Sequence, residues 1–318
     1  MIKVENLTKL FGAKHAVDGI SFSVGRGEVL GFLGPNGAGK STTMRMITGF
    51  ISPSGGKVSV GGFDIVDQPI AAKRLIGYLP ENAPAYTDMT VHGFLNFAAE
   101  IRGLTGEARK QAVNRVVEMC FLRSVLHQSV ETLSKGYRHR TCFAQSIIHD
   151  PDVLILDEPT DGLDPNQKHE VRSLIRRMGE KKAIIFSTHI LEEVDAVCSR
   201  ALIIDRGRIV ANGTPQELRR KSEYAGAVTI SVRGVAAASV TQRLGQLSAA
   251  KRAAVVSEAG SKVTVTVFPR PNADSELTRA VMDASQGWQV EELHTEEGRL
   301  DEVFRNITMP DTAKEVAK

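Results

Sequence analysis

The feature that most constrains this 318-residue chain is a glycine-rich turn that ends in lysine and lies between two regular segments. The apolar run Val29–Leu33 before it is typical of a short buried strand, and Ser41–Thr48 after it is typical of a helix that Gly49 can end. Glycines let successive backbone N–H groups point to one place, and the helix adds its positive end there. The spacing GxxxxGK[ST] in this setting predicts a phosphate-binding turn, with a chance match as the alternative. Its residues are Gly34, Pro35, Asn36, Gly37, Ala38, Gly39, Lys40, Ser41 and Thr42.

Two adjacent acids, Asp157 and Glu158, directly follow the apolar run Val153–Leu156. Such acids at the end of a buried strand are costly unless a cation compensates their charge. A Mg²⁺ ion carried by bound phosphates would do so, with Asp157 in its ligand shell and Glu158 accepting a proton from water. His189 ends another apolar strand, and parallel strands end at one edge of a sheet, so we expect it to reach the same pocket. The alternatives are acids that are merely exposed and a structural histidine.

The pattern of apolar runs and glycines predicts an α/β domain over residues 1–220. Continuous apolar runs favour a mostly parallel sheet buried on both faces. The alternating segments Ile2–Val4 and Ile20–Val24 predict an additional antiparallel β portion. Helical patterns such as Val91–Ile101 predict a helical subdomain, at about residues 83–150, inserted into this core.

A change of composition near Ser222 predicts a second, small α+β domain over residues 222–310. The expected order is βαββαβ followed by a last helix, which is typical of a ferredoxin-like domain. The predicted strands and helices are residues 228–232, 237–247, 253–256, 262–268, 274–284, 289–293 and 300–307. Asp311–Lys318 is expected to be a frayed tail.

Composition limits the classes of partner and compartment. The net charge of +3 is too small to indicate a nucleic acid partner. The three cysteines form no CxxC pair, which favours buried thiols in a reducing compartment over a metal site. No apolar run approaches the roughly 18 residues that a membrane helix needs, and no apolar leader segment opens the chain. If the protein acts at a membrane, a partner is expected to hold it there.

The segment Leu133–Arg138, with the sequence LSKGYR, resembles the LSGGQ signature of the ATPase subunits of ABC transporters. It lies between the phosphate-binding turn and Asp157, in the order that this family requires, and Asp161–Asp164 resembles the family's D-loop. The resemblance covers residues 1–220. It implies a P-loop NTPase fold that binds ATP and Mg²⁺ and hydrolyses ATP to drive transport through separate membrane subunits.

The resemblance also implies roles for individual residues. Phe11 stands where an aromatic ring stacks on adenine, and the turn from Gly34 to Thr42 binds the phosphates. Ser134 and Gly136 would contact the ATP held by the opposite subunit of a head-to-tail dimer, with Asp164 of the D-loop nearby. The implied catalytic residues are Lys40, the general base Glu158 and the γ-phosphate sensor His189. The implied metal ligands are Ser41, Glu81 and Asp157.

Two departures from the family pattern distinguish this chain. Glu81 stands where the Q-loop usually has glutamine, and Lys135 and Tyr137 replace a glycine and a glutamine of the signature. The substitutions leave the hydrolysis rate open. Together they resemble the gliding-motility-associated and related bacterial exporter subgroup. That likeness implies export rather than import.

The expected assembly is a homodimer bound to transmembrane permease subunits at the cytoplasmic face of the inner membrane. The C-terminal domain would stabilise the dimer, regulate it, or serve as a structural appendix. Two other functions remain open at this point: a soluble ABC ATPase that works on ribosomes or DNA, and a nucleotide-binding module that does not hydrolyse ATP. The modest net charge disfavours the first, and the intact Lys40, Glu158 and His189 disfavour the second.

Overall fold

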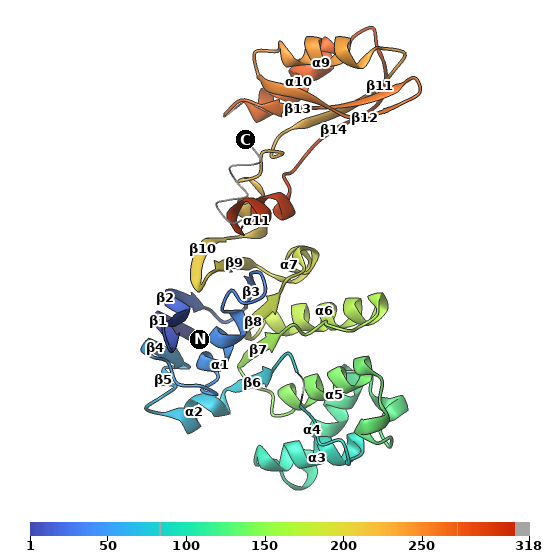
Figure 1. Ribbon diagram of the computed structural model, residues 1–318. Coiled ribbons are helices and arrows are strands. Elements are labelled where there is room, and N and C mark those ends of the chain that lie inside the picture. The colour runs from blue at the N-terminus through green and yellow to red at the C-terminus, as the bar shows by residue number, and fades with distance from the viewer. Residues whose placement is uncertain (83, 272, 309–318) are drawn as a thin grey trace. The chain divides into compact units, whose positions relative to one another are not determined.

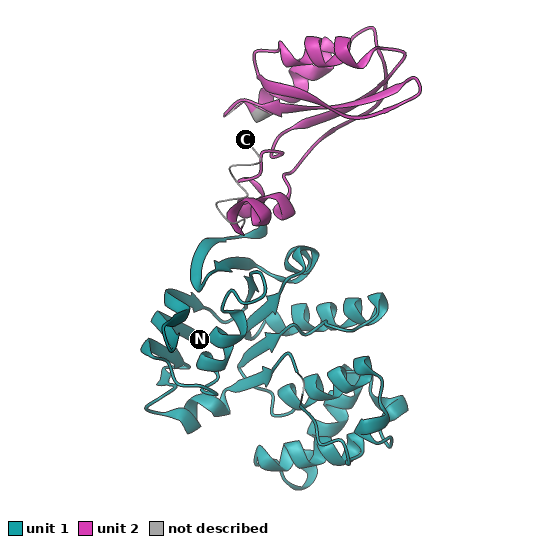
Figure 2. Cartoon of the chain, viewed as in Figure 1, with its two compact units in different colours: residues 1–215 teal, residues 216–318 magenta. Residues whose placement is uncertain are grey.

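A computed structural model describes residues 1–82, 84–271 and 273–308. Contacts within the chain divide it into two compact units, residues 1–215 and 216–318 (Figure 2). The predicted frayed tail, Asp311–Lys318, lies outside the described residues. No helix in the described part of the chain is both long and apolar enough to cross a membrane.

The first unit is built around a six-stranded sheet with the strand order β10-β9-β3-β8-β7-β6 (Figure 1). All neighbouring strands run parallel except the edge pair β9 and β10. The apolar runs form its central strands, which are buried on both faces, as the sequence predicts. The strands are β3 (Glu28–Leu33), β6 (Ile76–Leu79), β7 (Val153–Asp157), β8 (Ala183–Thr188), β9 (Arg200–Asp205) and β10 (Arg208–Gly213).

A second, antiparallel sheet has the order β2-β1-β4-β5. The predicted antiparallel portion is confirmed, since Ile2 pairs with Val24 and Val4 pairs with Phe22. One hydrophobic core joins both sheets and includes Leu7, Leu30 and Met44. The strands are β1 (Ile2–Phe11), β2 (Lys14–Val24), β4 (Gly55–Val60) and β5 (Phe63–Asp64).

Helices of the first unit fall into two groups. Those next to the sheets are α1 (Lys40–Ile47), α2 (Pro69–Arg74), α6 (Pro165–Gly179) and α7 (Leu191–Val197). The others form a helical block, in which α3, α4 and α5 pack against one another (Figure 1). The block contains α3 (Val91–Ile101), α4 (Gly106–Met119), α5 (Lys135–Ile147) and the short 3₁₀ helices η1 (Arg123–Val125) and η2 (Val130–Thr132).

From β11 onward, the second unit has the element order that the sequence predicts, and the short helix α8 precedes it. Its antiparallel sheet has the order β12-β13-β11-β14, and its core lies between this sheet and the helices α9 and α10. On the other side, hydroxyl groups pair across strands, as in Thr229–Thr266 at 2.8 Å. The elements are α8 (Pro215–Arg219), β11 (Val228–Arg233), α9 (Ala237–Gly245), β12 (Ala250–Ala259), β13 (Lys262–Pro269), α10 (Asp274–Ala284), β14 (Gln289–Thr295) and α11 (Leu300–Thr308).

Candidate functional site

The glycine-rich turn connects β3 to α1, and backbone conformation or close packing requires glycine at three of its positions. Gly39 has a φ of +109°, and a Cβ atom there would lie 2.5 Å from the carbonyl oxygen of Ala16. Gly37 has a φ of +80°, a conformation that side chains disfavour. A Cβ on Gly34 would lie 2.4 Å from the carbonyl oxygen of Ile204. The turn therefore packs directly against the backbone at Ala16 and Ile204.

Lys40 is the first residue of α1 and is buried. Its Nζ donates to the carbonyl oxygens of Gly34 at 2.7 Å and of Pro35 at 3.3 Å. Burial lowers the pKa of this ammonium from its ordinary value, while the negative charges of Glu158, Asp157 and Glu81 oppose that shift. The loop thus holds a positive charge beside three acids.

The two adjacent acids lie at the end of β7 and are held by the neighbouring strand β8. Asp157 is 2% exposed and accepts a hydrogen bond from Ser187 Oγ at 2.5 Å. The backbone N–H of Glu158 donates to the carbonyl oxygen of Ser187 at 3.2 Å and to its Oγ at 3.1 Å. Glu158 has a φ of +51°, so a non-glycine residue occupies the left-handed region here. No motif in the sequence marks Ser187, because only strand pairing brings it to Asp157.

His189 follows β8 and meets Glu158. Its Nδ1 lies 3.0 Å from both carboxylate oxygens of Glu158, and its side chain is 55% exposed. Burial raises the pKa of Glu158 above its ordinary value, and the opposing effects of His189 and Lys40 are smaller. The carboxylate is therefore a stronger proton acceptor than an exposed one.

A hollow of about 480 Å³ lies over the turn and is large enough for a small organic ligand. It brings together Phe11, Glu81 and Glu158, which are far apart in sequence. Lys14 and Ala16 also line it, and neither was predicted, because the sequence contains no signal for the position of the β1–β2 hairpin. The lining residues are Phe11, Lys14, Ala16, Pro35, Asn36, Gly37, Gly39, Lys40, Ser41, Thr42, Glu81 and Glu158.

Five of the expected nucleotide-binding residues do not line this hollow: Gly34 and Ala38 of the turn itself, and Ser134, Gly136 and Asp164 farther along the chain. Ser134 begins α5, where its Oγ accepts a hydrogen bond from the N–H of Tyr137 at 3.3 Å. Gly136 packs so closely on α6 that a Cβ atom would lie 2.5 Å from Gln167 Oε1. Asp164 begins α6 and accepts from the N–H of Gln167 at 2.9 Å. Ser134 and Asp164 are exposed at the beginnings of α5 and α6, with Gly136 buried beneath them, and we call this region the α5–α6 surface.

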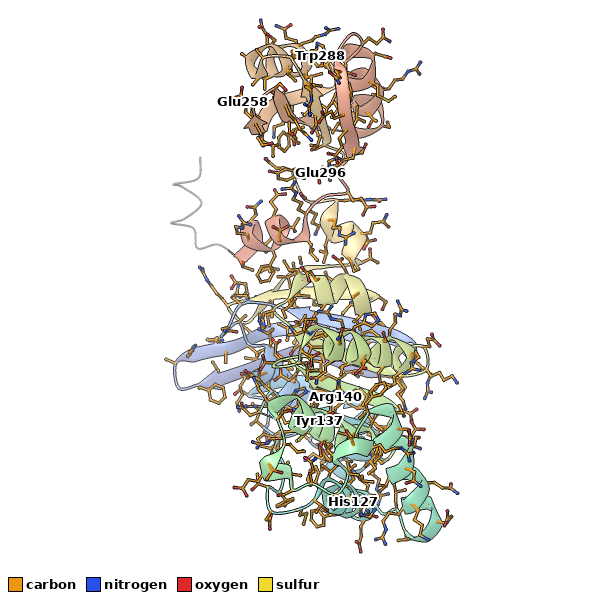
Figure 3. The ribbon with its side chains drawn as sticks, turned by 90° about the vertical axis from the view of Figure 1, so that its right-hand side faces the viewer. His127, Tyr137, Arg140, Glu258, Trp288 and Glu296 are labelled. Atoms are coloured by element: carbon orange, nitrogen blue, oxygen red, sulfur yellow. The ribbon has the colours of Figure 1, made fainter. Side chains whose placement is uncertain are left out.

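The unusual signature residues have partners within the chain. Lys135 Nζ lies 2.8 Å from Asp161 Oδ2, in the turn that follows Glu158. The guanidinium of Arg140 lies 5.9 Å from the ring centroid of Tyr137, and both are labelled in Figure 3. Lys135 therefore connects the beginning of α5 to the turn after β7.

The donor groups at the hollow suit Mg²⁺ with a phosphate-bearing ligand. Mg²⁺ usually binds one or two carboxylates together with phosphate oxygens and water. Asp157 and Glu158 are both buried at the end of β7, and a divalent cation would compensate the cost of burying these adjacent carboxylates. Among the described residues no group of three or more His, Cys, Asp or Glu side chains forms a metal cage by itself. The chain therefore fits an ion that arrives with its phosphates.

Comparisons with known proteins agree with this chemistry. A family model described as ABC transporter matches residues 17–161. The chain is 38% identical over 237 residues to the linearmycin resistance ATP-binding protein of Bacillus subtilis, covering 74% of this chain and 76% of that protein. It is 38% identical over 219 residues to the Nod factor export ATP-binding protein I of Ralstonia nicotianae, covering 69% of this chain and 68% of that protein.

A solved structure of an ATP-binding subunit of an ABC transporter has a similar fold. Its TM-score is 0.65 and its sequence identity is 30%, with 70% of this chain and 92% of that chain covered.

Proposed function

Because this chain belongs to the ABC transporter family, as an ATP-binding subunit that hydrolyses ATP to drive transport, we propose which of its residues bind and cleave the nucleotide. The triphosphate lies in the hollow above the glycine-rich turn, where backbone N–H groups and the end of α1 face it. Lys40 binds the β- and γ-phosphates, exchanging its carbonyl partners for phosphate oxygens. Phe11, which is half exposed at the rim, stacks on the adenine ring.

We further propose that Ser41, Asp157 and Glu81 would hold Mg²⁺ beside the phosphates. When bound, the ion neutralises charge that develops on the phosphoryl oxygens. Ser187 fixes the Asp157 carboxylate by hydrogen bonding, so this ligand is already oriented. Glu81 adds a negative charge where a neutral amide would add none.

Glu158 is the proposed general base. Its carboxylate takes a proton from a water molecule whose oxygen bonds to the γ-phosphorus, while the bond to the bridging oxygen breaks and ADP leaves. His189 binds the Glu158 carboxylate through Nδ1. The imidazole is more than half exposed, so its other ring nitrogen, Nε2, remains available to the γ-phosphate. Proton transfer by a positioned base contributes about 10²–10⁴-fold to the rate.

One solved bacterial ABC transporter cassette is described as dimeric, and another is described as part of a transporter complex. We propose a head-to-tail homodimer in which the α5–α6 surface of one copy covers the hollow of the other. Ser134, Gly136 and Asp164 would then complete the site of the second copy. This arrangement is supported by their position outside the hollow of their own chain.

The membrane partner has a candidate docking place in the helical block. A mostly apolar hollow of about 410 Å³ lies beside α3, and its aromatic lining residues are Tyr86, Phe94 and Phe97. We propose that permease subunits dock there and hold the protein peripherally at the cytoplasmic face of the inner membrane. Names such as linearmycin resistance and Nod factor export, which belong to relatives, support export as the direction of transport.

The observation that best supports this function is that Lys40 and Glu158 line the same hollow. We expect Lys40→Met to lose ATP binding, whereas Glu158→Gln should bind ATP and lose nearly all phosphate release. Nucleotide titration and a phosphate-release assay on the same preparations measure the two effects. Wild-type turnover by Glu158→Gln would show that the base is another group.

A further inference from the structure

Glu193 is a buried carboxylate that the roles above do not use. It lies in the first turn of α7, and its side chain is 0% exposed. Its Oε1 accepts hydrogen bonds from Thr160 Oγ1 at 2.5 Å and from Arg172 Nη2 at 3.0 Å. Its Oε2 accepts from Thr188 Oγ1 at 2.7 Å. Charge pairing and three donors compensate the cost of burying this group.

One donor comes from the turn that carries the proposed base. Thr160 is buried and lies two residues after Glu158. The N–H of Asp161 donates to the carbonyl oxygen of Glu158 at 3.1 Å, so the segment folds into a tight turn. Since Glu158 has a left-handed backbone, surrounding contacts must hold this turn in place. The hydrogen bond from Thr160 to Glu193 is one such contact.

The other threonine lies next to the histidine of the site. Thr188 Oγ1 accepts a hydrogen bond from the N–H of Ile190 at 3.0 Å, so its own proton is free to go to Glu193. His189 lies between these two residues. The hydroxyl therefore ties the backbone on both sides of the histidine to the same carboxylate.

We propose that Glu193 is a positioning residue that sets the distance between Glu158 and His189. The two oxygens of one rigid carboxylate each hold one of the segments that carry these groups. Arg172 of α6 supplies the balancing charge, and one carboxylate oxygen accepts from each hydroxyl. The inference rests on the proposed roles of Glu158 and His189.

The experiment removes each hydroxyl without changing the volume of the side chain. We expect Thr160→Val and Thr188→Val to lower kcat for ATP hydrolysis by about 10- to 100-fold, with ATP affinity changed less than about twofold. Thr188→Ser, which keeps the hydroxyl, should restore most of kcat. Thr266→Val is the matched control, because it removes a buried hydroxyl bonded to Thr229 in the second unit.

Two results with the single variants would overturn the role of Glu193. One is a kcat within about twofold of wild type in both valine variants, and the other is a loss of kcat matched by an equal loss of ATP affinity. A second test places Thr160→Val in the Glu158→Gln background, where residual turnover should not fall further; an additional loss of tenfold or more would contradict the inference. Active valine variants beside an inactive Glu158→Gln would reject only the role of Glu193.

Discussion

The three glycines of the phosphate-binding turn allow backbone strain and steric collision to be measured separately. A Cβ on Gly37 would meet nothing within 4 Å, so Gly37→Ala adds only the strain of φ +80°. Gly39→Ala adds strain at φ +109° and a collision 2.5 Å from a backbone oxygen. Left-handed strain costs about 1–2 kcal/mol for alanine, and overpacking adds about 1–3 kcal/mol. We therefore expect losses of about 1.5 kcal/mol for Gly37→Ala and about 3.5 kcal/mol for Gly39→Ala.

Thermal unfolding without nucleotide measures these losses. In a unit of this size 1 kcal/mol corresponds to about 2–4 °C, which gives decreases in Tm of about 3–6 °C for Gly37→Ala and about 7–14 °C for Gly39→Ala. Gly34→Ala, with a collision at 2.4 Å and no positive φ, should fall between them. The single tryptophan, Trp288, lies in the second unit, so its fluorescence should report an unchanged transition there (Figure 3). Equal Tm values for Gly37→Ala and Gly39→Ala would refute the packing argument.

Further predictions concern the charged groups and the thiols. Burial raises the pKa of Glu158, and only its ionised form accepts a proton. We therefore expect kcat/KM to fall as pH decreases through a pKa above that of an ordinary carboxyl. A pH–rate profile that is flat in this range would contradict the role of Glu158 as general base. The Lys135 hydrogen bond lowers the pKa of Asp161, so its stabilisation is present above the unfolded pKa and is lost as pH falls through the folded value. Urea unfolding of Lys135→Asp, Asp161→Lys and the double variant should give a coupling free energy of about 0.2–1 kcal/mol between the two residues, and added salt should reduce it. A coupling free energy that is identical at high salt would argue against the ion pair. Burial raises the pKa of Cys120 and Cys142 to about 12, so a thiol reagent should modify them only after unfolding.

Local patterns were sufficient to predict the α/β fold of the first unit, and the comparison with a solved structure confirms that fold. The family, which the resemblance predicted, is confirmed by the relatives. Val29–Leu33 and Val153–Leu156 lie within strands because continuous apolar runs suit a sheet buried on both faces. The first and last residues of individual strands were predicted less accurately than the fold. The strand predicted at 253–256 extends over Ala250–Ala259, because it lies at a sheet edge and the added polar residues Lys251, Arg252, Ser257 and Glu258 are exposed there, where apolar character is not required.

The site was predictable only where a motif or a strand end marks a residue. Lys40 and Glu158 carry such marks, and the structure brings both to one hollow. Lys14 and Ser187 carry none, since their places depend on strand pairings between distant segments. Glu193 is hidden for the same reason: on a short helix it resembles any solvated acid, and only the fold surrounds it with donors.

At Glu158, the left-handed backbone means that folding and catalysis favour different residue types. Folding alone would favour glycine or asparagine at this position, because both adopt such a conformation at little cost. Turnover, on the proposed mechanism, requires a longer carboxylate. A designer who ranked substitutions by heat resistance alone would therefore be led to delete the group on which the work of the protein depends.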